Sequence, residues 1–308
     1  MRNAFAKELT KLASKRKDIC LLSGDIGNRM FDEFKKVAPN RFLNCGIAEA
    51  NMMSVASGMG LSGLRPFVYT ITPFTTIRCL EQIKIGVAYH ESPVTIVGTG
   101  SGLSYSELGP THHSLEDLAI LRAIPNINVL TPSDSKELVA QMQEALELSK
   151  PTYIRIGKKG EPKIYHDNSH LGIGKFNLLK EGSDTLVLAA GTILAEALEA
   201  TKILEEKGIS IGLAGVGGIK PLDHNFLLEM AKHYSNWVSI EEHGVIGGLG
   251  STLLEWISEN KLKDVQLKRM GTPDQFINSL GSQNYTRSLL GIDKYSLVKE
   301  VELLLNKR

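Results

Sequence analysis

Short apolar runs rich in β-branched residues alternate with helical patterns along most of this 308-residue chain. Apolar runs of this length are typical of strands buried on both faces of a parallel sheet, and the helical stretches between them supply the crossovers. In the first half the expected strands are 19–22, 41–44, 65–70, 94–98, 128–130 and 152–156, and the expected helices are 2–14, 30–37, 48–61, 76–89, 115–122 and 135–149. The alternation predicts a doubly wound α/β domain with a mainly parallel sheet.

The alternation stops after residue 157, where Gly, Lys, Asn and Pro accumulate, and it resumes near residue 184. The second set of expected strands is 185–190, 209–214, 237–241 and 265–268, and the helices are 193–207, 225–234, 250–259 and 297–306. We therefore expect two α/β domains, at residues 1–165 and 184–308, joined by a linker at 166–183. The second domain is the smaller one.

Charge and cysteine content exclude several kinds of partner and site. The formal net charge is +1 and long Lys/Arg runs are absent, which argues against nucleic acid or an anionic membrane as the main partner. Cys20, Cys45 and Cys79 are too few and too irregularly spaced for a disulfide framework or a zinc site. The first residues lack the apolar core of a secretion signal, and no stretch approaches the ~20 apolar residues of a membrane span. We expect a folded, cytoplasmic protein that handles a small molecule or another protein.

Glu49 stands at the start of the expected helix 48–61, directly after a strand and Gly46. It is the only ionisable side chain of that helix. Apolar surroundings disfavour the charged form of a carboxylic acid, so Glu49 is a candidate proton donor or partner of a ring nitrogen. The alternative is an ordinary first-turn glutamate that the helix dipole favours.

Three further segments follow expected strands, where open α/β sheets bind ligands. Phe74 follows the third strand across a Thr/Pro turn, although a single phenylalanine is more often a core residue. The loop 97–113 is rich in Gly and Ser and ends on His112 and His113, which suits substrate handling better than metal binding. Arg155, near the end of a strand, either grips a phosphate or forms an ion pair.

Taken together, the chain resembles the pyrimidine-binding and carboxyl-terminal domains of thiamine-diphosphate enzymes of the transketolase and deoxyxylulose-phosphate synthase type. The resemblance covers nearly the whole chain and rests on several segments in a fixed order. They are GIAE at 46–49, RP at 65–66, GPTH at 109–112, LRAIPN at 121–126, TPSD at 131–134, and SIEEH with GGLG at 239–250.

The resemblance implies cofactor contacts for four residues. Glu49 would hydrogen-bond the aminopyrimidine ring of thiamine diphosphate and drive its imino tautomer, which makes it a catalytic residue. Phe74 would pack against the same ring. Ile47, inside the GIAE segment, and Asp25 are the other expected cofactor neighbours.

On the substrate side the resemblance implies that His112 contacts the sugar as a second catalytic residue and that Arg155 holds the sugar phosphate. Arg29 stands where those enzymes have a serine, and we expect it to be a compensating phosphate ligand. At two positions the chain differs from the family, and these differences predict an unusual donor sugar or a weakened activity. Gly100 replaces a histidine or arginine, and Leu108 replaces an acidic residue that reads a sugar hydroxyl.

The family binds the cofactor diphosphate through a metal held by a GDG segment and a later asparagine on an amino-terminal domain, as a hard cation requires. Here Asp25 with Asn51 lacks the second glycine and lies in the wrong domain, so no metal site is expected in this chain. The resemblance therefore implies one half of a split enzyme. Its partner would be an N-terminal transketolase subunit that carries the diphosphate domain and Mg²⁺ or Ca²⁺, and two such pairs around a homodimeric core would form a heterotetramer.

The leading hypothesis is the C-terminal subunit of a transketolase-type transferase that moves a two-carbon ketol unit between phosphorylated sugars. A β subunit of a 2-oxo-acid dehydrogenase uses the same cofactor, but the LRAIPN and TPSD segments and the Thr111-His112 pair favour the first interpretation. A third hypothesis is a non-catalytic paralogue that binds a partner. Gly100 and Leu108 motivate it, and Glu49 argues against it.

Overall fold

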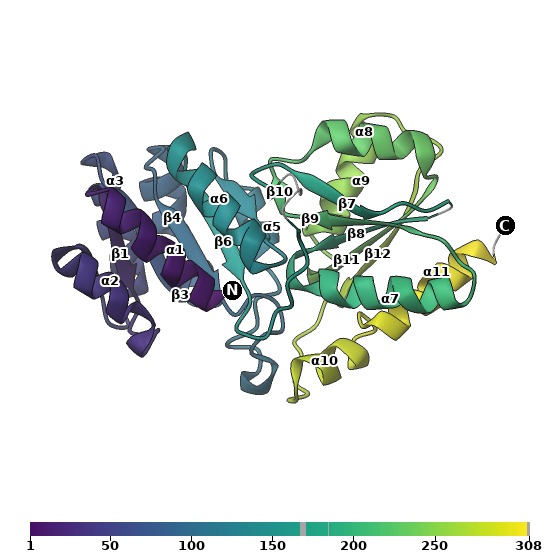
Figure 1. Ribbon diagram of the computed structural model, residues 1–308, viewed down its shortest axis with the longest axis horizontal. Coiled ribbons are helices and arrows are strands. Elements are labelled where there is room, and N and C mark those ends of the chain that lie inside the picture. Colours follow the sequence, from purple (N-terminus) through teal and green to yellow (C-terminus); the bar gives the residue numbers. More distant parts are fainter. Residues whose placement is uncertain (167–170, 184, 307–308) are drawn as a thin grey trace.

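Two α/β units lie side by side along the long axis of the molecule (Figure 1). The computed structural model describes residues 1–166, 171–183 and 185–306. A seven-stranded sheet forms the first unit and a five-stranded sheet forms the second. Both sheets are mainly parallel, so the expected fold class of two doubly wound α/β domains is confirmed. Within these residues no helix is long and apolar enough to cross a membrane.

The first sheet has the strand order β10-β5-β6-β4-β3-β1-β2, and all its strands except β10 run in the same direction. The carboxyl ends of neighbouring strands therefore meet at one edge of the sheet. The parallel strands are β1 (Ile19–Ser23), β2 (Phe42–Asn44), β3 (Arg65–Ile71), β4 (Thr95–Thr99), β5 (Asn128–Leu130) and β6 (Thr152–Ile156).

Helices cover both faces of the first sheet. One face packs against α1 (Arg2–Lys15), α2 (Asp32–Val37) and α6 (Ser135–Leu148), which supply buried residues such as Phe5, Phe34 and Leu138. The other face packs against α3 (Glu49–Leu61), α5 (Asp117–Arg122) and a π-helix at Gln82–Tyr89.

The expected helix 76–89 is present from residue 77, but it is not a regular α-helix. The chain instead forms α4 (Thr72–Thr75), a 3-10 turn (Ile77–Cys79) and the π-helix. The carbonyl of Gly86 accepts a hydrogen bond from the Ser57 hydroxyl of α3, and a Cβ at position 86 would lie 3.2 Å from that hydroxyl oxygen. The π-helix and α3 are therefore in close contact at Gly86. The spacing of apolar residues in the sequence does not predict such a contact or the change of helix type.

The second sheet has the strand order β12-β11-β8-β9-β7. Its strands are β7 (Phe176–Lys180), β8 (Thr185–Ala190), β9 (Gly212–Val216), β11 (Asn236–Gly244) and β12 (Gln266–Thr272). Helices α8 (His224–His233) and α9 (Leu249–Glu259) cover one face, and α7 (Leu194–Glu206) and α11 (Lys294–Leu305) cover the other (Figure 1). The unexpected helix α10 (Gln283–Leu289) packs near the 3-10 turn Ser106–Leu108 of the first unit.

Two strands differ from the expected division into domains. β7 lies inside the segment 166–183, the expected linker, and it pairs antiparallel with β9. Residues 167–170 of that segment lie outside the described part of the chain. β10 (Gly218–Lys220) belongs to the second half of the sequence but completes the first sheet by pairing antiparallel with β5. One hydrophobic core runs through both units.

Candidate active site

The candidate site lies at the carboxyl edge of the first sheet, where open α/β folds bind their ligands. Six parallel strands end there, and the site lies beyond five adjacent ones, in the order β6-β4-β3-β1-β2. The segments that follow them carry Lys158, the loop 100–113, Phe74 with Arg78, Gly24 with Asp25, and Glu49.

Glu49 begins α3 and is 3 % exposed. Its Oε2 accepts a hydrogen bond of 2.8 Å from Nη1 of Arg78, which forms an ion pair with it. The sequence predicts an acid alone among apolar residues that keeps its proton. The structure differs, because the guanidinium of Arg78 lies in contact with the acid, which is therefore not alone.

Arg78 links Glu49 to Phe74. The guanidinium carbon lies 4.2 Å from the centroid of the Phe74 ring, and the side chain of Arg78 is 47 % exposed. The Phe74 ring in turn meets the ring of His112 edge to face, with 5.4 Å between the centroids. Three residues expected at the site, Glu49, Phe74 and His112, are therefore brought together, with Arg78 between the first two.

The contacts continue from His112 to the segment after β6. The ring centroids of His112 and Tyr105 lie 6.1 Å apart, and Nζ of Lys158 lies 4.5 Å from the centroid of the Tyr105 ring. Lys158 also pairs with Glu107. We call Glu49, Arg78, Phe74, His112, Tyr105 and Lys158 the carboxyl-edge cluster.

His112 is suited to exchange hydrogen bonds in a neutral state. Burial, with a smaller contribution from neighbouring His113, lowers the pKa of its imidazole below the usual value. Its Nδ1 lies 2.9 Å from the Thr111 hydroxyl oxygen, which orients the ring. A neutral imidazole can donate from one nitrogen and accept at the other.

Tyr105 explains why position 100 is a glycine. The backbone of Gly100 has a φ of +80°, and a Cβ there would lie 2.1 Å from Cε2 of Tyr105. The tyrosine ring fills the space that a side chain at position 100 would enter, so the two residues form a matched pair. Leu108, the other departure, is an exposed apolar residue on the same loop.

Arg155 lies outside the cluster. It is 5 % exposed, its Nη2 donates to the carbonyls of Ser114 and Glu242 at 3.1 Å, and its Nε lies 3.2 Å from Asp117. The contact with Glu242 on β11 links the two units, and the other two lie within the first unit. The guanidinium of Arg155, expected to bind a phosphate, is thus hydrogen-bonded where the two units meet.

The remaining expected residues lie at the margin of the site. Oδ1 of Asp25 accepts a 2.9 Å hydrogen bond from Asn44, which links the ends of β1 and β2. A Cβ at neighbouring Gly24 would lie 3.4 Å from Cγ of Glu49, so this segment borders the buried acid. Ile47 is 85 % exposed, and exposed Arg29 has no contact with the carboxyl-edge cluster among the described interactions. In the described part of the chain, no group of three or more His, Cys, Asp or Glu side chains could hold a metal ion.

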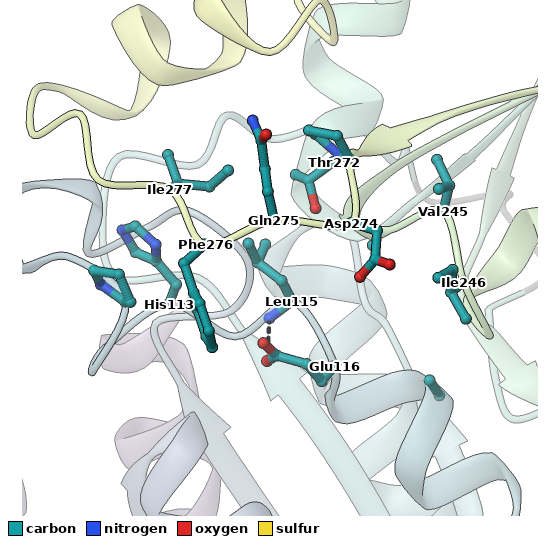
Figure 2. A pocket seen from close by; sticks show the side chains of 14 residues that line it. His113, Leu115, Glu116, Val245, Ile246, Thr272, Asp274, Gln275, Phe276 and Ile277 are labelled. Carbon is teal, nitrogen blue, oxygen red and sulfur yellow. Dashed lines mark hydrogen bonds between the residues drawn. The ribbon is translucent and has the colours of Figure 1, made fainter.

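Two pockets flank the loop that carries His112. The smaller, of about 340 Å³, is lined by Ser104, Glu107, Lys158, Lys159, Gly281, Ser282 and Gln283. The larger, of about 480 Å³, lies between the two units, with His113, Glu116, Asp274 and Phe276 around it (Figure 2). None of the carboxyl-edge cluster lines the larger pocket, so its size alone does not make it the site.

Sequence reasoning missed Arg78, Tyr105 and Lys158. Lys158 comes two residues after the end of β6, and this position after a strand was the available signal. Arg78 falls in a segment that resembles a continuous helix, and the contacts of Tyr105 depend on segments far apart in the chain.

Comparisons with known proteins identify the family of both units. Residues 1–162 match the family model of the transketolase pyrimidine-binding domain, and residues 174–294 match that of the transketolase C-terminal domain. The chain is 33% identical over 300 residues to an apulose-4-phosphate transketolase subunit of Phocaeicola vulgatus, covering 97% of this chain and 95% of the relative.

One further relative is about twice as long as this chain, and a solved relative is of similar length. The chain is 33% identical over 307 residues to 1-deoxy-D-xylulose-5-phosphate synthase of Halothermothrix orenii, which covers 99% of this chain but 48% of the synthase. A split-gene transketolase solved as an inactive β4 tetramer is 33% identical, with a TM-score of 0.89 over 99% of this chain and 97% of that one.

Proposed function

The chain belongs to the transketolase family, and we propose that it is the C-terminal subunit of a split, thiamine-diphosphate-dependent transketolase that moves a two-carbon ketol unit between phosphorylated sugars. The observation that carries the proposal is the buried carboxylate of Glu49, which pairs with Arg78, whose guanidinium in turn lies over the ring of Phe74. The relatives are transketolase subunits and synthases, which supports this interpretation over a dehydrogenase β subunit.

The residues around Glu49 fit the aminopyrimidine ring. The planar, nitrogen-bearing guanidinium of Arg78 already lies on the Phe74 ring and donates to Glu49, so the space accepts a flat group with N–H donors. We call this space, between the Phe74 ring and the Glu49 carboxylate, the pyrimidine slot. Phe74 would stack on the ring and Glu49 would bond its nitrogen, with Ile47 and Asp25 at the margin.

Thiamine diphosphate, when bound, supplies a nucleophilic carbon that takes up the two-carbon unit. Glu49 would hold a proton at its Oε2 and share it with the ring nitrogen, a role that its burial supports once Arg78 is no longer in contact. His112, neutral and oriented by Thr111, would hydrogen-bond the oxygen atoms of the sugar.

We assign the sugar phosphate to Lys158. This lysine lies over the Tyr105 ring, which also contacts His112, and it lines the 340 Å³ pocket together with Lys159 and Ser282. Arg155 remains a proposal from the family resemblance, but its buried contacts favour a structural role. Arg29 is exposed and stays a proposed second ligand.

Lys158→Ala should raise the KM for a phosphorylated acceptor sugar by about 10- to 100-fold, because a charge-assisted bond to phosphate is lost. The unphosphorylated form of the same sugar is the internal control, and its KM should not change. Steady-state kinetics of the reconstituted enzyme measures both. An equal loss with both sugars would contradict the assignment.

The surface around the site suits a partner subunit. Several large apolar side chains are exposed on α3, on the segment before it and on the adjoining π-helix and 3-10 turn. They are Ile47, Val55, Leu61, Ile77, Ile85 and Tyr89. An exposed apolar face of this kind marks a protein contact, and α3 and the π-helix pack against each other to form it. We propose that the N-terminal transketolase subunit covers this face and supplies the diphosphate domain with its Mg²⁺ or Ca²⁺, and that two such pairs assemble around a homodimeric core.

Mixing this chain with an N-terminal transketolase subunit should produce ketol transfer that neither chain shows alone. The reason is that the slot for the ring and the site for the diphosphate lie on different chains. The measurement is the cofactor-dependent rate, with size-exclusion chromatography coupled to light scattering to report the assembly. Tight, metal-dependent binding of thiamine diphosphate by this chain alone would refute the split-enzyme proposal, and stable binding of the partner without any transfer would favour the non-catalytic alternative.

A further inference from the structure

We infer that Arg78 is a placeholder in the pyrimidine slot: it occupies the slot in the unassembled chain and must swing out before the aminopyrimidine ring can enter. This inference rests on the proposed function, because it takes Glu49 and Phe74 as the two sides of the slot. It adds a residue that controls how readily the slot receives its ligand.

The first argument is that Arg78 makes both contacts that the ring requires. Its Nη1 donates to Oε2 of Glu49 at 2.8 Å, and its guanidinium carbon lies 4.2 Å from the centroid of the Phe74 ring. A guanidinium is flat, carries N–H donors and stacks on aromatic rings, so it imitates one edge and both faces of an aminopyrimidine. The arginine and the ring cannot hold these contacts at the same time.

The second argument is that Arg78 is held loosely enough to leave. Its side chain is 47 % exposed, and its described contacts are those with Glu49 and Phe74 alone. It sits on the 3-10 turn Ile77–Cys79, between the short helix α4 and the π-helix, and not inside a long helix. A half-exposed ion pair and one cation–π contact together favour the inward position by about 10-fold.

The consequence is a lower affinity of the unassembled chain for the ring. A site that is open only a fraction of the time binds its ligand more weakly by that fraction. If the inward position of Arg78 is favoured by about 10-fold, the apparent affinity for the ring is lowered by about the same factor. The partner subunit would supply the remaining contacts and shift the balance toward the ring.

The test is the Kd of thiamine diphosphate for the unassembled full chain, measured by titration calorimetry. Arg78→Ala should bind about 10-fold more tightly than the unaltered chain, because the slot is then permanently open. Arg269→Ala is the matched control: it removes an exposed arginine of β12, outside the carboxyl-edge cluster, without opening the slot, and its Kd should not change.

Equal affinities of the Arg78→Ala variant and the unaltered chain, or weaker binding by the variant, would overturn the placeholder. The proposed function is judged separately, by the Kd of the assembled pair. If Phe74→Ala weakens thiamine diphosphate binding there, the slot holds the ring whatever Arg78 does. If Phe74→Ala leaves that Kd unchanged, the proposed slot itself is wrong.

Discussion

Glu49→Gln should lower the rate of ketol transfer by the reconstituted enzyme by about 10³-fold, within the range that positioned proton transfer contributes to catalysis. Glutamine keeps the size and the acceptor oxygen of the side chain, but it cannot hold or release the proton. Glutamine is uncharged, so the substitution also places no new charge at this buried position of the slot. The measurement is kcat at saturating cofactor, with assembly checked by light scattering.

Glu33→Gln is the control for this experiment. Glu33 is an exposed acid of α2 that pairs with Lys36 outside the carboxyl-edge cluster, so its replacement tests a change of one acid to an amide away from the site. Its kcat should stay within a few-fold of the unaltered enzyme. An unchanged rate for Glu49→Gln, with assembly intact, would remove Glu49 from the proposed mechanism.

Glu242→Ala should cost about 3 kcal/mol of unfolding free energy, because it takes one partner from a buried ionic network. Glu242, on β11 of the second unit, is buried and pairs with Arg287. Its Oε2 also accepts a 3.3 Å hydrogen bond from the backbone N–H of Leu103, in the loop that carries Tyr105 and His112. A Cβ at Gly102 would lie 2.5 Å from Cβ of Glu242, so loop and strand are in close contact.

The same variant should lower kcat/KM by about 10- to 100-fold, since small displacements of catalytic groups reduce rates by such factors. Chemical denaturation and steady-state kinetics measure the two effects. Glu255→Ala is the matched control, because Glu255 also pairs across the joint, with Arg122, but is exposed. Its cost should be below about 1 kcal/mol. Full stability of Glu242→Ala would show that the second unit does not position the loop.

The interior parallel strands could be predicted because they are short apolar runs, buried on both faces of their sheets. The edge strands β2 and β12 are largely exposed and follow from the alternation of strands and helices. β10 could not be predicted, since Gly218–Lys220 is three residues long and forms a strand only where β5 offers a partner. β7 lies in a segment rich in polar residues and glycine, which gives no strand pattern. The π-helix Gln82–Tyr89 bonds to α3 through Gly86 and Ser57, a tertiary contact that no local pattern predicts.

At the candidate site, sequence reasoning singled out the carboxyl edge of the first sheet and three residues that contact one another or a common neighbour, Glu49, Phe74 and His112. It did not find Arg78, because an ion pair across 29 residues is a tertiary contact. The phosphate role of Arg155 stays a prediction: Arg155 lies inside β6, and Lys158, which we propose for the phosphate, comes after that strand.

β10 also limits where the chain can be truncated, because it lies in the second half of the sequence but pairs with β5 of the first sheet. Without Gly218–Lys220, the outer side of β5 would present unpaired N–H and C=O groups, and a bare margin of this kind recruits strands from other molecules. A fragment that ends near residue 165 would therefore be prone to aggregate, even though its own helices and parallel strands are complete. Genetic fusions or truncations of this protein should keep both halves on one continuous chain.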